Sequence, residues 1–298
     1  MENDFIKSVN LIKTDGDYFA NDAISVSRMK RIKVSPAHYK EAEEIKETDA
    51  MRFGSAYHSF VLEPEKFESE YYIFDDKSIC QTLIGEGYKS PRSTKAYKEW
   101  QASEMRIIGD KNVIKQDEFD RIKTMRDKLF SHPYARKLLS KGEPEVGIGG
   151  TIKTIVGDIE VKLKPDYIKA DKHTIVDLKT AMDASQDGFT RAAAGRDYHI
   201  QAAFYSDMVE AMRGDNIAQR FIFIAQEKTK PYAFNLFEAS PQYIGQGRYE
   251  YEMLLQLYKY CMDNDKWPGY QCFCENRYGL LELNLPKYAI KPLDYYTY

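Results

Sequence analysis

The feature that most constrains the fold is a pair of segments rich in β-branched residues in the middle of the chain. Val146 to Val156 and Ile159 to Leu163 are the two segments, and Gly157-Asp158 lies between them. Two such segments joined by a turn dipeptide are typical of a β-hairpin. Thr174-Ile175-Val176 has the same character and predicts a third strand. The sequence therefore predicts a compact sheet in the centre of the chain.

Helical patterns lie on both sides of this sheet. Apolar residues at helical spacing predict helices, with further short strands after the centre. The expected helices are 50–62, 93–107, 116–130, 198–212 (ending at Gly214) and 241–262, and the further strands are 220–225 and 233–237. This order predicts an α/β (α+β) fold, with a central mixed β-sheet flanked by helices and helical decoration at the N-terminus. We expect one domain over 1–298, mainly helical to about 135, with the sheet core and last helix from about 136 to 290.

Composition narrows the class of protein. The chain has 298 residues, of which 43% are hydrophobic and 30% charged, which is typical of a water-soluble globular protein. Its longest apolar run, Phe221 to Ala225, is far too short to span a membrane. The N-terminal segment lacks the apolar stretch of a secretory signal. We therefore expect a cytoplasmic protein with no membrane partner.

The net charge of −3 argues neither for nor against a nucleic-acid partner, because basic side chains can gather on one face. Such clusters are more often solvated surfaces, but two are candidates for DNA contact. The first is preferred because it precedes the helix that contains His58, and Arg52 of that helix is grouped with it. The first cluster is Arg28, Lys30, Arg31 and Lys33, and the second is Lys89, Arg92, Lys95 and Lys98.

Three candidate site residues lie in KPDYIKADKHTIVDLKT, residues 164–180: Asp166, Asp177 and Lys179. If Asp166 begins one strand and Asp177 ends the next, their carboxylates converge. Two close carboxylates repel each other unless a cation lies between them, and hard oxygen ligands suit Mg²⁺. Lys179 shares a strand face with Asp177, and the Leu178 carbonyl could complete the metal shell.

This combination is suited to metal-assisted phosphodiester hydrolysis. The lysine could orient a water, help to deprotonate it or stabilise developing negative charge. The ordinary alternative is that Pro-Asp is a turn and Asp-Leu-Lys a surface ion pair, so these residues alone leave both interpretations open.

Other candidates lie on the flanking segments. Gln201 and Tyr205 are one helical turn apart and could hold a phosphate or a lysine near the site. His58 follows Gly54 by one turn and could bind metal or phosphate. Glu145, just before the first central strand, offers a third carboxylate. Each of these residues, taken alone, is more typical of an ordinary helix or surface position.

Taken together, these segments resemble the PD-(D/E)XK nuclease superfamily, and within it the RecE-like exonucleases (exodeoxyribonuclease VIII). The ordered motifs are FGSAYH, PEVGI, KPDYI, IVDLKT and YHIQAAFYSD. Further similar segments are ISVSRMKRIKVSPAHYK, VLEPEKFESEY, STKAYKEW, MRDKLFSHPYARKLL and NDKWPGY, so the resemblance covers about residues 22–290. The chain lacks the long N-terminal region of full-length RecE, which suggests a stand-alone, phage-type nuclease.

The resemblance implies roles for individual residues. Asp166 and Asp177 would bind metal, and Lys179 would be the catalytic lysine. His58 would be a further ligand, Glu145 would be the acidic residue before the first strand, and Gln201 and Tyr205 would match the trailing Gln-x-x-x-Tyr motif. The third acid of the superfamily is often Glu, whereas this chain has Asp177, as in the RecE branch.

The resemblance also implies an activity. It is the Mg²⁺-dependent digestion of linear double-stranded DNA in the 5′ to 3′ direction, with Mn²⁺ as a substitute, which leaves 3′ overhangs for recombination by strand annealing. The implied partners are duplex DNA ends, a RecT-like annealing protein and further copies of the chain in a ring.

Three alternatives remain open from the sequence. One is another nuclease of the superfamily, either an endonuclease or an exonuclease with an iron–sulfur cluster. The second is a non-catalytic DNA-binding scaffold, and the third is a metal enzyme that acts on another substrate. The four cysteines, Cys80, Cys261, Cys272 and Cys274, fit an iron–sulfur cluster poorly, because Cys272 and Cys274 have one residue between them.

Overall fold

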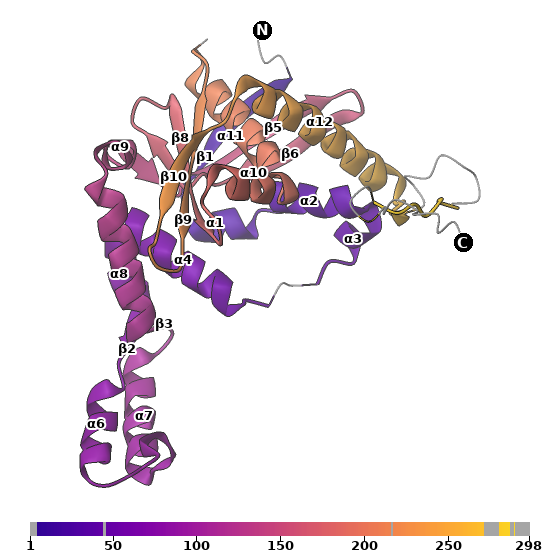
Figure 1. Ribbon diagram of the computed structural model, residues 1–298. Helices are drawn as coiled ribbons and strands as arrows, with labels where there is room; N and C mark the ends of the chain where they lie inside the picture. The colour runs from indigo at the N-terminus through magenta and orange to yellow at the C-terminus, as the bar shows by residue number, and fades with distance from the viewer. Residues whose placement is uncertain (1–4, 44–45, 216, 271–279, 287–288, 290–298) are drawn as a thin grey trace, which may run out of the picture.

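The computed structural model describes residues 5–43, 46–215, 217–270, 280–286 and 289 (Figure 1). Two sheets form the body of the molecule, with helices packed against them, and a narrow arm projects from the body. This architecture confirms the predicted α/β fold with a central mixed sheet flanked by helices. Among the described residues, no helix is long and apolar enough to cross a membrane.

The larger sheet has five strands in the order β10-β9-β8-β7-β4. Strands β8 and β9 are parallel, whereas every other neighbouring pair is antiparallel, so the sheet is mixed. The strands are β4 (Gly142–Pro144), β7 (Tyr167–Lys169), β8 (Thr174–Ala181), β9 (Arg220–Glu227) and β10 (Phe234–Glu238).

Strand β8 corrects one detail of the sequence prediction. Asp177 was expected at the end of a short strand, but β8 continues to Ala181, which pairs with Glu227 of β9. Parallel pairing along the whole of β9 extends the strand beyond its β-branched beginning. Asp177 therefore lies in the middle of a central strand.

The second sheet is antiparallel, in the order β1-β5-β6, with β1 (Ile6–Ile12), β5 (Gly147–Thr154) and β6 (Gly157–Leu163). The predicted hairpin is confirmed, but the position of its turn was wrong. Thr154 pairs with Gly157, so Ile155 and Val156 form the turn, and Gly157 begins β6 with a φ of 122°. Only glycine adopts that φ without strain.

Strand β1 is a further difference, because the sequence analysis expected no strand near the N-terminus. Its seven residues, IKSVNLI, are mostly exposed and give a weak periodic signal. The strand forms because its backbone pairs with β5, from Ile6 opposite Ile152 to Ile12 opposite Gly147. Non-local pairing of this kind is invisible to local propensity.

The five-stranded sheet buries a hydrophobic cluster on each face. Side chains alternate along β8, so Ile175 packs on one face, whereas Val176 and Leu178 pack on the other. The first face is covered by α2 (Val26–Val34), α11 (Tyr198–Arg213) and α12 (Pro241–Asn264), and the second by α4 (Asp49–Leu62) and α8 (Gln116–Ser131). The predicted helices over 50–62, 116–130, 198–212 and 241–262 correspond to four of these elements.

Smaller helices complete the body. They are α1 (Asp15–Ala20), α3 (Pro36–Lys40), α5 (Pro64–Glu70), α9 (Pro133–Leu138) and α10 (Gln186–Gly195). Helices α11 and α12 pack closely because α12 has glycine at the contact. A Cβ atom on Gly247 would lie 2.0 Å from the carbonyl oxygen of His199. The buried carboxylate of Asp207 also joins them, since it accepts hydrogen bonds from Arg248 (Nε, 2.7 Å) and the Tyr251 hydroxyl (2.6 Å).

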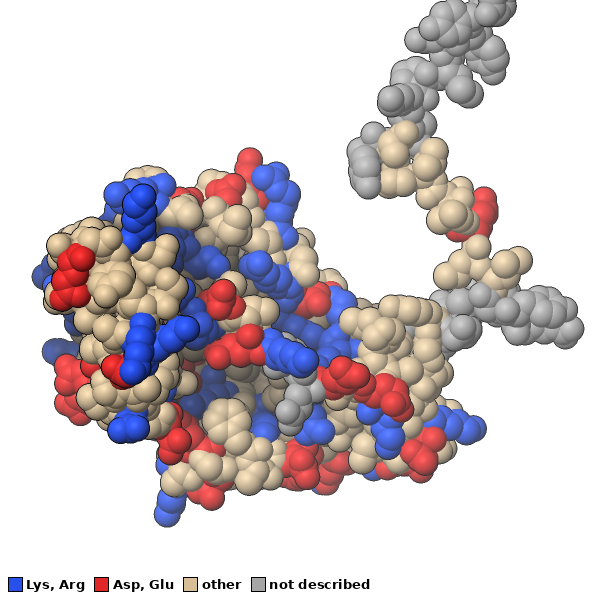
Figure 2. All heavy atoms as spheres, turned by 90° about the horizontal axis from the view of Figure 1, so that it is seen from below, with Lys and Arg blue, Asp and Glu red and all other residues tan. Residues whose placement is uncertain are grey.

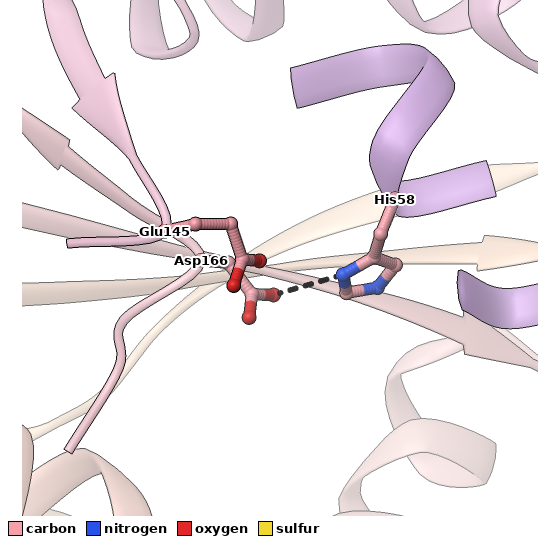
Figure 3. Close-up of side chains that lie close together, drawn as sticks. All are labelled: His58, Glu145 and Asp166. Carbon is pink, nitrogen blue, oxygen red and sulfur yellow. Dashed lines mark ion pairs between the residues drawn. The ribbon is translucent and has the colours of Figure 1, made fainter. Parts of the chain in front are cut away.

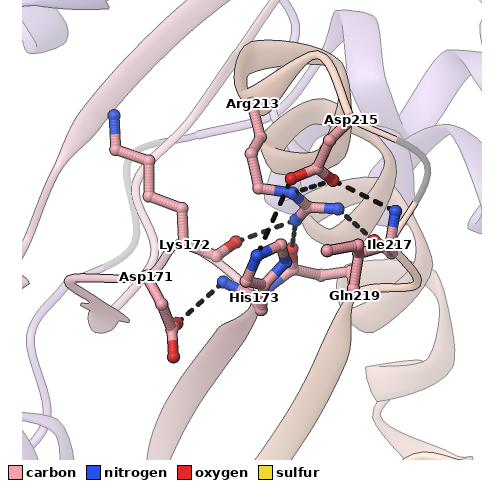
Figure 4. A network of polar contacts seen from close by, with 7 residues as sticks. All are labelled: Asp171, Lys172, His173, Arg213, Asp215, Ile217 and Gln219. Atoms are coloured by element: carbon pink, nitrogen blue, oxygen red, sulfur yellow. Dashed lines mark hydrogen bonds and ion pairs between the residues drawn. The ribbon is translucent and has the colours of Figure 1, made fainter.

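A polar network fixes the C-terminal end of α11 against the sheet (Figure 4). Arg213 donates to the backbone oxygen of Lys172 (2.9 Å) and pairs with Asp215. Asp215 also lies 3.7 Å from the His173 ring, in the turn between β7 and β8. The network therefore ties α11 to the turn that joins the two strands bearing the expected acids.

The arm comprises β2 (Tyr71–Phe74), α6 (Lys77–Gly85), η1 (Pro91–Ser93), α7 (Lys95–Ile108) and β3 (Asn112–Lys115), and it extends away from the body (Figure 1). Strands β2 and β3 are parallel and form its base. Asp76 holds its segments together, because the carboxylate accepts hydrogen bonds from Arg92 (2.6 and 3.0 Å) and Tyr97 (2.8 Å).

A buried polar network sets the position of α4, the helix that carries His58. The Tyr57 hydroxyl donates to the Gln226 side-chain oxygen. The Gln226 amide donates in turn to the carbonyl oxygens of Met125 (3.0 Å) and Tyr232 (3.2 Å). All the polar atoms of the Gln226 side chain are thereby paired inside the core, and α4 is joined to β9 and α8.

We expect Tyr57→Phe to lower the free energy of unfolding by about 1–3 kcal/mol, because it leaves the buried Gln226 oxygen without a donor. Urea denaturation measures the change. Tyr249→Phe is the matched control, since Tyr249 is 63% exposed on α12 and should lose almost nothing. Equal stability of the two variants would contradict a role for this network.

Candidate active site

Three of the expected metal ligands converge at the start of β7. His58 of α4, Glu145 and Asp166 each place one ligand atom within 4.8 Å of the other two (Figure 3). The ion pair drawn joins His58 Nδ1 and Asp166 Oδ2 at 3.5 Å. Segments far apart in the sequence thus supply one nitrogen and two carboxylates to a single point.

Backbone contacts explain how the two carboxylates come together. Asp166 precedes β7, and the antiparallel register of Tyr167 with Val176 places it across from Asp177. The backbone N–H of Glu145 donates to the Asp166 carbonyl oxygen (3.1 Å), which holds Glu145 beside it with a φ of 51°. The backbone N–H of Leu178 donates to Asp166 Oδ2 (2.8 Å) and orients that carboxylate.

The Leu178 backbone lies beside the His58 ring, where it acts to raise the pKa of the imidazole against the stronger effect of burial. The Leu178 side chain is buried on the opposite face, against α4 and α8. The Leu178 backbone therefore lies beside the group of His58, Glu145 and Asp166, and a role for its carbonyl oxygen as a metal ligand stays a prediction.

Asp177 lies outside this three-residue group and is fully buried. Its Oδ2 accepts a hydrogen bond from Gln201 of α11 (2.7 Å), and its Oδ1 lies 2.6 Å from Lys179 Nζ. The Lys179 contact is an ion pair without an aligned hydrogen bond, so Oδ1 keeps a vacant lone pair. A role for Asp177 as a metal ligand stays a prediction.

Lys179 shares the strand face of Asp177, as expected from its spacing. Burial lowers the pKa of its ammonium group, but the carboxylates of Asp177 and Asp166 outweigh burial and raise it above its usual value. Lys179 Nζ also lies 5.1 Å from the centre of the Tyr198 ring. The ammonium group is therefore held in its charged form, suited to donating hydrogen bonds to an anion.

The pKa values of the remaining groups fit a site that accepts a cation. Burial raises the pKa of Glu145 to about 7, and nearby Asp166 adds to this. Burial and Asp166 also raise the pKa of Asp177 to about 6, against the opposing effect of Lys179. Burial lowers the pKa of His58, which favours the neutral imidazole that binds metals.

A divalent cation is consistent with this donor set. The carboxylates of Glu145 and Asp166 repel each other, as the raised pKa of Glu145 shows, and a cation would relieve the repulsion. Two carboxylates, one carbonyl and one imidazole are donors that Mg²⁺ and Mn²⁺ both accept. His58, Glu145, Asp166 and the Leu178 carbonyl would hold it, and Asp177 is adjacent.

The other expected residues have defined partners. Burial raises the pKa of the Tyr205 hydroxyl, against the smaller opposing effect of the Lys164 backbone beside it. Gln201 holds a carboxylate rather than the phosphate or lysine that the sequence suggested. Arg52 pairs with Glu118 of α8 at 3.1 Å and with Asp49 at 3.3 Å, so it joins α4 to α8.

The basic residues of α2 divide between two surroundings. Lys30 donates to the Arg196 carbonyl oxygen (2.7 Å), and Lys33 pairs with Asp197 and Glu250, both at 2.6 Å. Arg28 instead donates to the carbonyl oxygen of Asp22, and Arg31 borders an open hollow. Lys30 is the one that faces the site, because Lys179 and Asp177 both influence its pKa, which burial lowers to about 8.

The second basic cluster lies on the arm, where Arg92 pairs with Asp76 and Lys95 with Glu99. Figure 2 shows the arm end-on beside the body. Lys and Arg side chains border the hollow between arm and body, and Asp and Glu are interspersed among them. Contact of this surface with DNA stays a prediction.

The sequence analysis assigned no role to two residues that shape the site. Lys164 Nζ lies 3.2 Å from Glu145 and 2.8 Å from Asp15, so it orients the Glu145 carboxylate. Tyr198 places its ring against both Lys179 and Lys30. Their positions in KPDYI and YHIQ were a signal, since both adjoin residues that were singled out.

The described cysteines lie far apart. Cys80 is on α6 of the arm, and Cys261 is buried near the end of α12, on the other side of the molecule (Figure 1). That separation argues against one cluster holding both. Cys272 and Cys274 lie outside the described residues.

The comparison with protein families identifies the family to which this chain belongs. Residues 25–277 match the family described as "PDDEXK-like domain of unknown function (DUF3799)". The match covers most of the chain, so this protein belongs to that family, within the PD-(D/E)XK nuclease superfamily. The fold and the acidic cluster described above are what that superfamily leads one to expect.

A solved structure supports the same fold. A crystal structure from Eubacterium rectale, described as that of a "Putative exonuclease", aligns with a TM-score of 0.58 and 17% identity over 93% of this chain and 96% of that chain. The structure of SSO0001 aligns with a TM-score of 0.30 and 16% identity over 67% and 85%, too low to carry an argument. No curated protein matches the sequence.

We expect the metal-free Glu145→Gln variant to gain stability relative to the wild type as the pH rises from about 4.5 to about 7. The raised pKa means that folded Glu145 keeps a proton that the unfolded chain has released, so wild-type stability falls with rising pH in this window. Urea denaturation in EDTA across the pH range measures the difference.

Glu143→Gln is the matched control, because Glu143 is exposed two residues earlier in the chain. Its stability should run parallel to that of the wild type at every pH. Added Mg²⁺ should stabilise the wild type more at pH 8 than at pH 5, since protons compete for the ligands. A Glu145→Gln curve parallel to the wild type would contradict the raised pKa.

Proposed function

We propose that this protein is a divalent-metal-dependent exodeoxyribonuclease that digests linear double-stranded DNA. The observation that carries the proposal is the convergence of His58, Glu145 and Asp166 beside the buried Asp177–Lys179 pair, within a PDDEXK-like domain. The description of the Eubacterium rectale protein as a "Putative exonuclease" supports the same activity. Mg²⁺ is the proposed cation, with Mn²⁺ as a substitute.

The residues have distinct tasks in phosphodiester cleavage. When bound, the cation would withdraw negative charge from the phosphate and lower the pKa of a water. Lys179, kept charged by Asp177 and Asp166, donates hydrogen bonds to the charge that develops on the phosphate oxygens. Of the three roles open from the sequence, charge stabilisation and water orientation suit a charged ammonium group, whereas proton removal does not.

The other side chains keep these groups in place. Gln201 fixes the Asp177 carboxylate through Oδ2, which leaves Oδ1 facing Lys179. Tyr198 covers Lys179 and Lys30 with its ring and limits the access of water to both ammonium groups. Lys30 brings a second positive charge to the substrate side of this assembly, where it can contact a phosphate of the DNA strand.

The sequence resemblance supports the finer features of the proposal. The protein would act 5′ to 3′ in the manner of the RecE-like exonucleases and leave 3′ overhangs for strand annealing. It would work with a RecT-like annealing protein in the cytoplasm and form a ring around its substrate. The ring would account for processive digestion.

A non-catalytic scaffold is the second candidate, and substitutions at the site separate the two. We expect Asp177→Asn and Lys179→Ala each to slow DNA cleavage by about 100-fold or more, because each removes charge needed in the transition state. Initial rates on linear duplex DNA with Mg²⁺ measure the loss. Lys123→Ala, an exposed lysine on α8, should cleave at the wild-type rate.

Far-ultraviolet circular dichroism should show that the inactive variants keep the wild-type fold. A Lys179→Ala rate within threefold of the wild type would remove Lys179 from the chemistry. Failure of the wild type to cleave any DNA with Mg²⁺ or Mn²⁺ would favour the scaffold.

A second experiment addresses substrate and polarity. Linear duplex DNA labelled separately at its 5′ and 3′ ends is incubated with Mg²⁺ beside a closed circular duplex. We expect early release of short products from the 5′ label, with the circle intact. Nicking of the circle would show an endonuclease, and early release from the 3′ label would reverse the proposed polarity.

A further inference from the structure

Helix α2 carries two pairs of basic residues on opposite faces. At about 100° per residue, Lys30 and Lys33 point within about 60° of each other, and Arg28 and Arg31 do so on the far side. The contacts agree, because Lys30 and Lys33 reach Arg196 and Asp197 beside the active site. The basic cluster that the sequence suggested as one DNA contact is therefore two separate surfaces.

The second pair borders a hollow of about 480 Å³ on the far side of α2. Its other walls come from α3, α12 and the segment that follows α12. A backbone hydrogen bond from Ala37 N–H to the Pro268 carbonyl oxygen (3.0 Å) holds that segment against α3. The residues that matter for the argument are Arg28, Arg31, Tyr39, Lys40, Tyr258 and Trp267.

Aromatic rings form a layered wall in this hollow. Tyr39 and Trp267 stack with ring centroids 5.4 Å apart and planes inclined by 16°. Tyr258 meets the Tyr39 ring edge-on at 5.4 Å. All three rings are only partly buried, so the wall is accessible to a ligand that presents a flat aromatic face.

Positive charges accompany each stacked ring. The Arg28 guanidinium lies 5.3 Å from the Tyr39 ring centre, and Lys40 Nζ lies 5.1 Å from that of Trp267. Lys40 is exposed and reaches its nearest acid, Asp265, only at 3.9 Å, a surface pair of little strength. Among the described residues that line the hollow, the three cations Arg28, Arg31 and Lys40 meet one acid, Asp22, while Asp265 lies at its edge and accepts a hydrogen bond from the Trp267 ring N–H (3.0 Å).

This alternation of cations and aromatic faces matches single-stranded nucleic acid. Phosphates pair with Lys and Arg, and unstacked bases lie on aromatic rings. A duplex hides the faces of its bases and would meet only the charges. Lys40, weakly held over Trp267, can move to a phosphate and leave the ring face to a base.

We propose that this hollow binds single-stranded DNA, and that its ligand in the working protein is the unpaired strand left by digestion. The second part rests on the proposed nuclease function, whereas the binding itself does not. One helix separates the two sites, since α2 presents Lys30 to the active site and Arg31 to the hollow. A strand freed at the catalytic centre is thus within a helix width of the aromatic wall.

Binding is tested with the full chain in EDTA, which prevents metal-dependent cleavage. The probe is a fluorescent oligothymidine of about 15 nucleotides, and anisotropy gives the dissociation constant. We expect Arg31→Glu and Lys40→Glu each to weaken binding about tenfold or more. Lys137→Glu makes the same charge change at an exposed lysine on α9, on the opposite side of the body, and should bind like the wild type (Figure 1).

Base stacking has its own test, because charge reversal alone cannot distinguish it from phosphate attraction. An abasic oligonucleotide of the same length should bind the wild type about tenfold more weakly than oligothymidine. Trp267→Leu should remove this preference, and Trp267→Phe should keep part of it. Equal binding of the two probes by the wild type would overturn the stacking role, and Arg31→Lys should restore binding if charge is what Arg31 contributes.

The outcomes separate this inference from the proposed function. In one outcome, the wild type cleaves linear duplex normally while Arg31→Glu and Lys40→Glu bind oligothymidine as the wild type does. That result would overturn the proposed DNA-binding role of the hollow and leave the proposed nuclease function standing. If the wild type cleaves no DNA but those variants lose oligothymidine binding, the binding role of the hollow is supported and the proposed nuclease function is overturned. If Lys137→Glu weakens oligothymidine binding as much as the other two variants do, the binding is non-specific charge attraction, and the proposed role of the hollow is overturned.

Discussion

The active-site architecture depends on one buried carboxylate, Asp177, in the middle of the central strand β8. An unpaired charge there would strongly destabilise the fold. Gln201 and Lys179 each engage one of its oxygen atoms, so the charge is matched by a hydrogen bond from α11 and an ammonium group on its own strand. The Asp177 carboxylate, together with that of Asp166, also keeps Lys179 charged, which links the stability of the sheet to the chemistry proposed for the site.

The group of His58, Glu145 and Asp166 is built from segments that are far apart in the sequence and meet only in the folded protein. His58 arrives on α4, which packs on the other face of the sheet, and the Tyr57–Gln226 network sets its position. A backbone hydrogen bond joins Glu145 to Asp166, and each carboxylate is also held through its side chain, Asp166 by the Leu178 N–H and Glu145 by Lys164. These surrounding contacts orient the carboxylates toward a common point, as the groups around a metal ligand do.

Helix α2 separates two surfaces of the molecule. One face brings Lys30 toward Lys179, and the other borders the hollow in which Tyr39 and Trp267 stack. The arm, which projects from the body, carries further Lys and Arg side chains with acids among them (Figures 1 and 2). The basic residues of this one helix thus contact different neighbours. The net charge of −3 therefore says little about which surface would contact DNA.

The sequence by itself determined the strand-forming centre and most of the helices, and it singled out the residues from which the acidic cluster is built. Period-2 and period-3.6 patterns are local, and Asp177 and Lys179 share a face because alternate residues of any strand do. Only the tertiary structure decided that β1 joins the sheet, that Asp177 faces Lys179 and Gln201 rather than the three-ligand group, and that Lys164 and Tyr198 support the site. These features depend on pairing and packing between distant segments, and no local pattern of residues encodes such contacts.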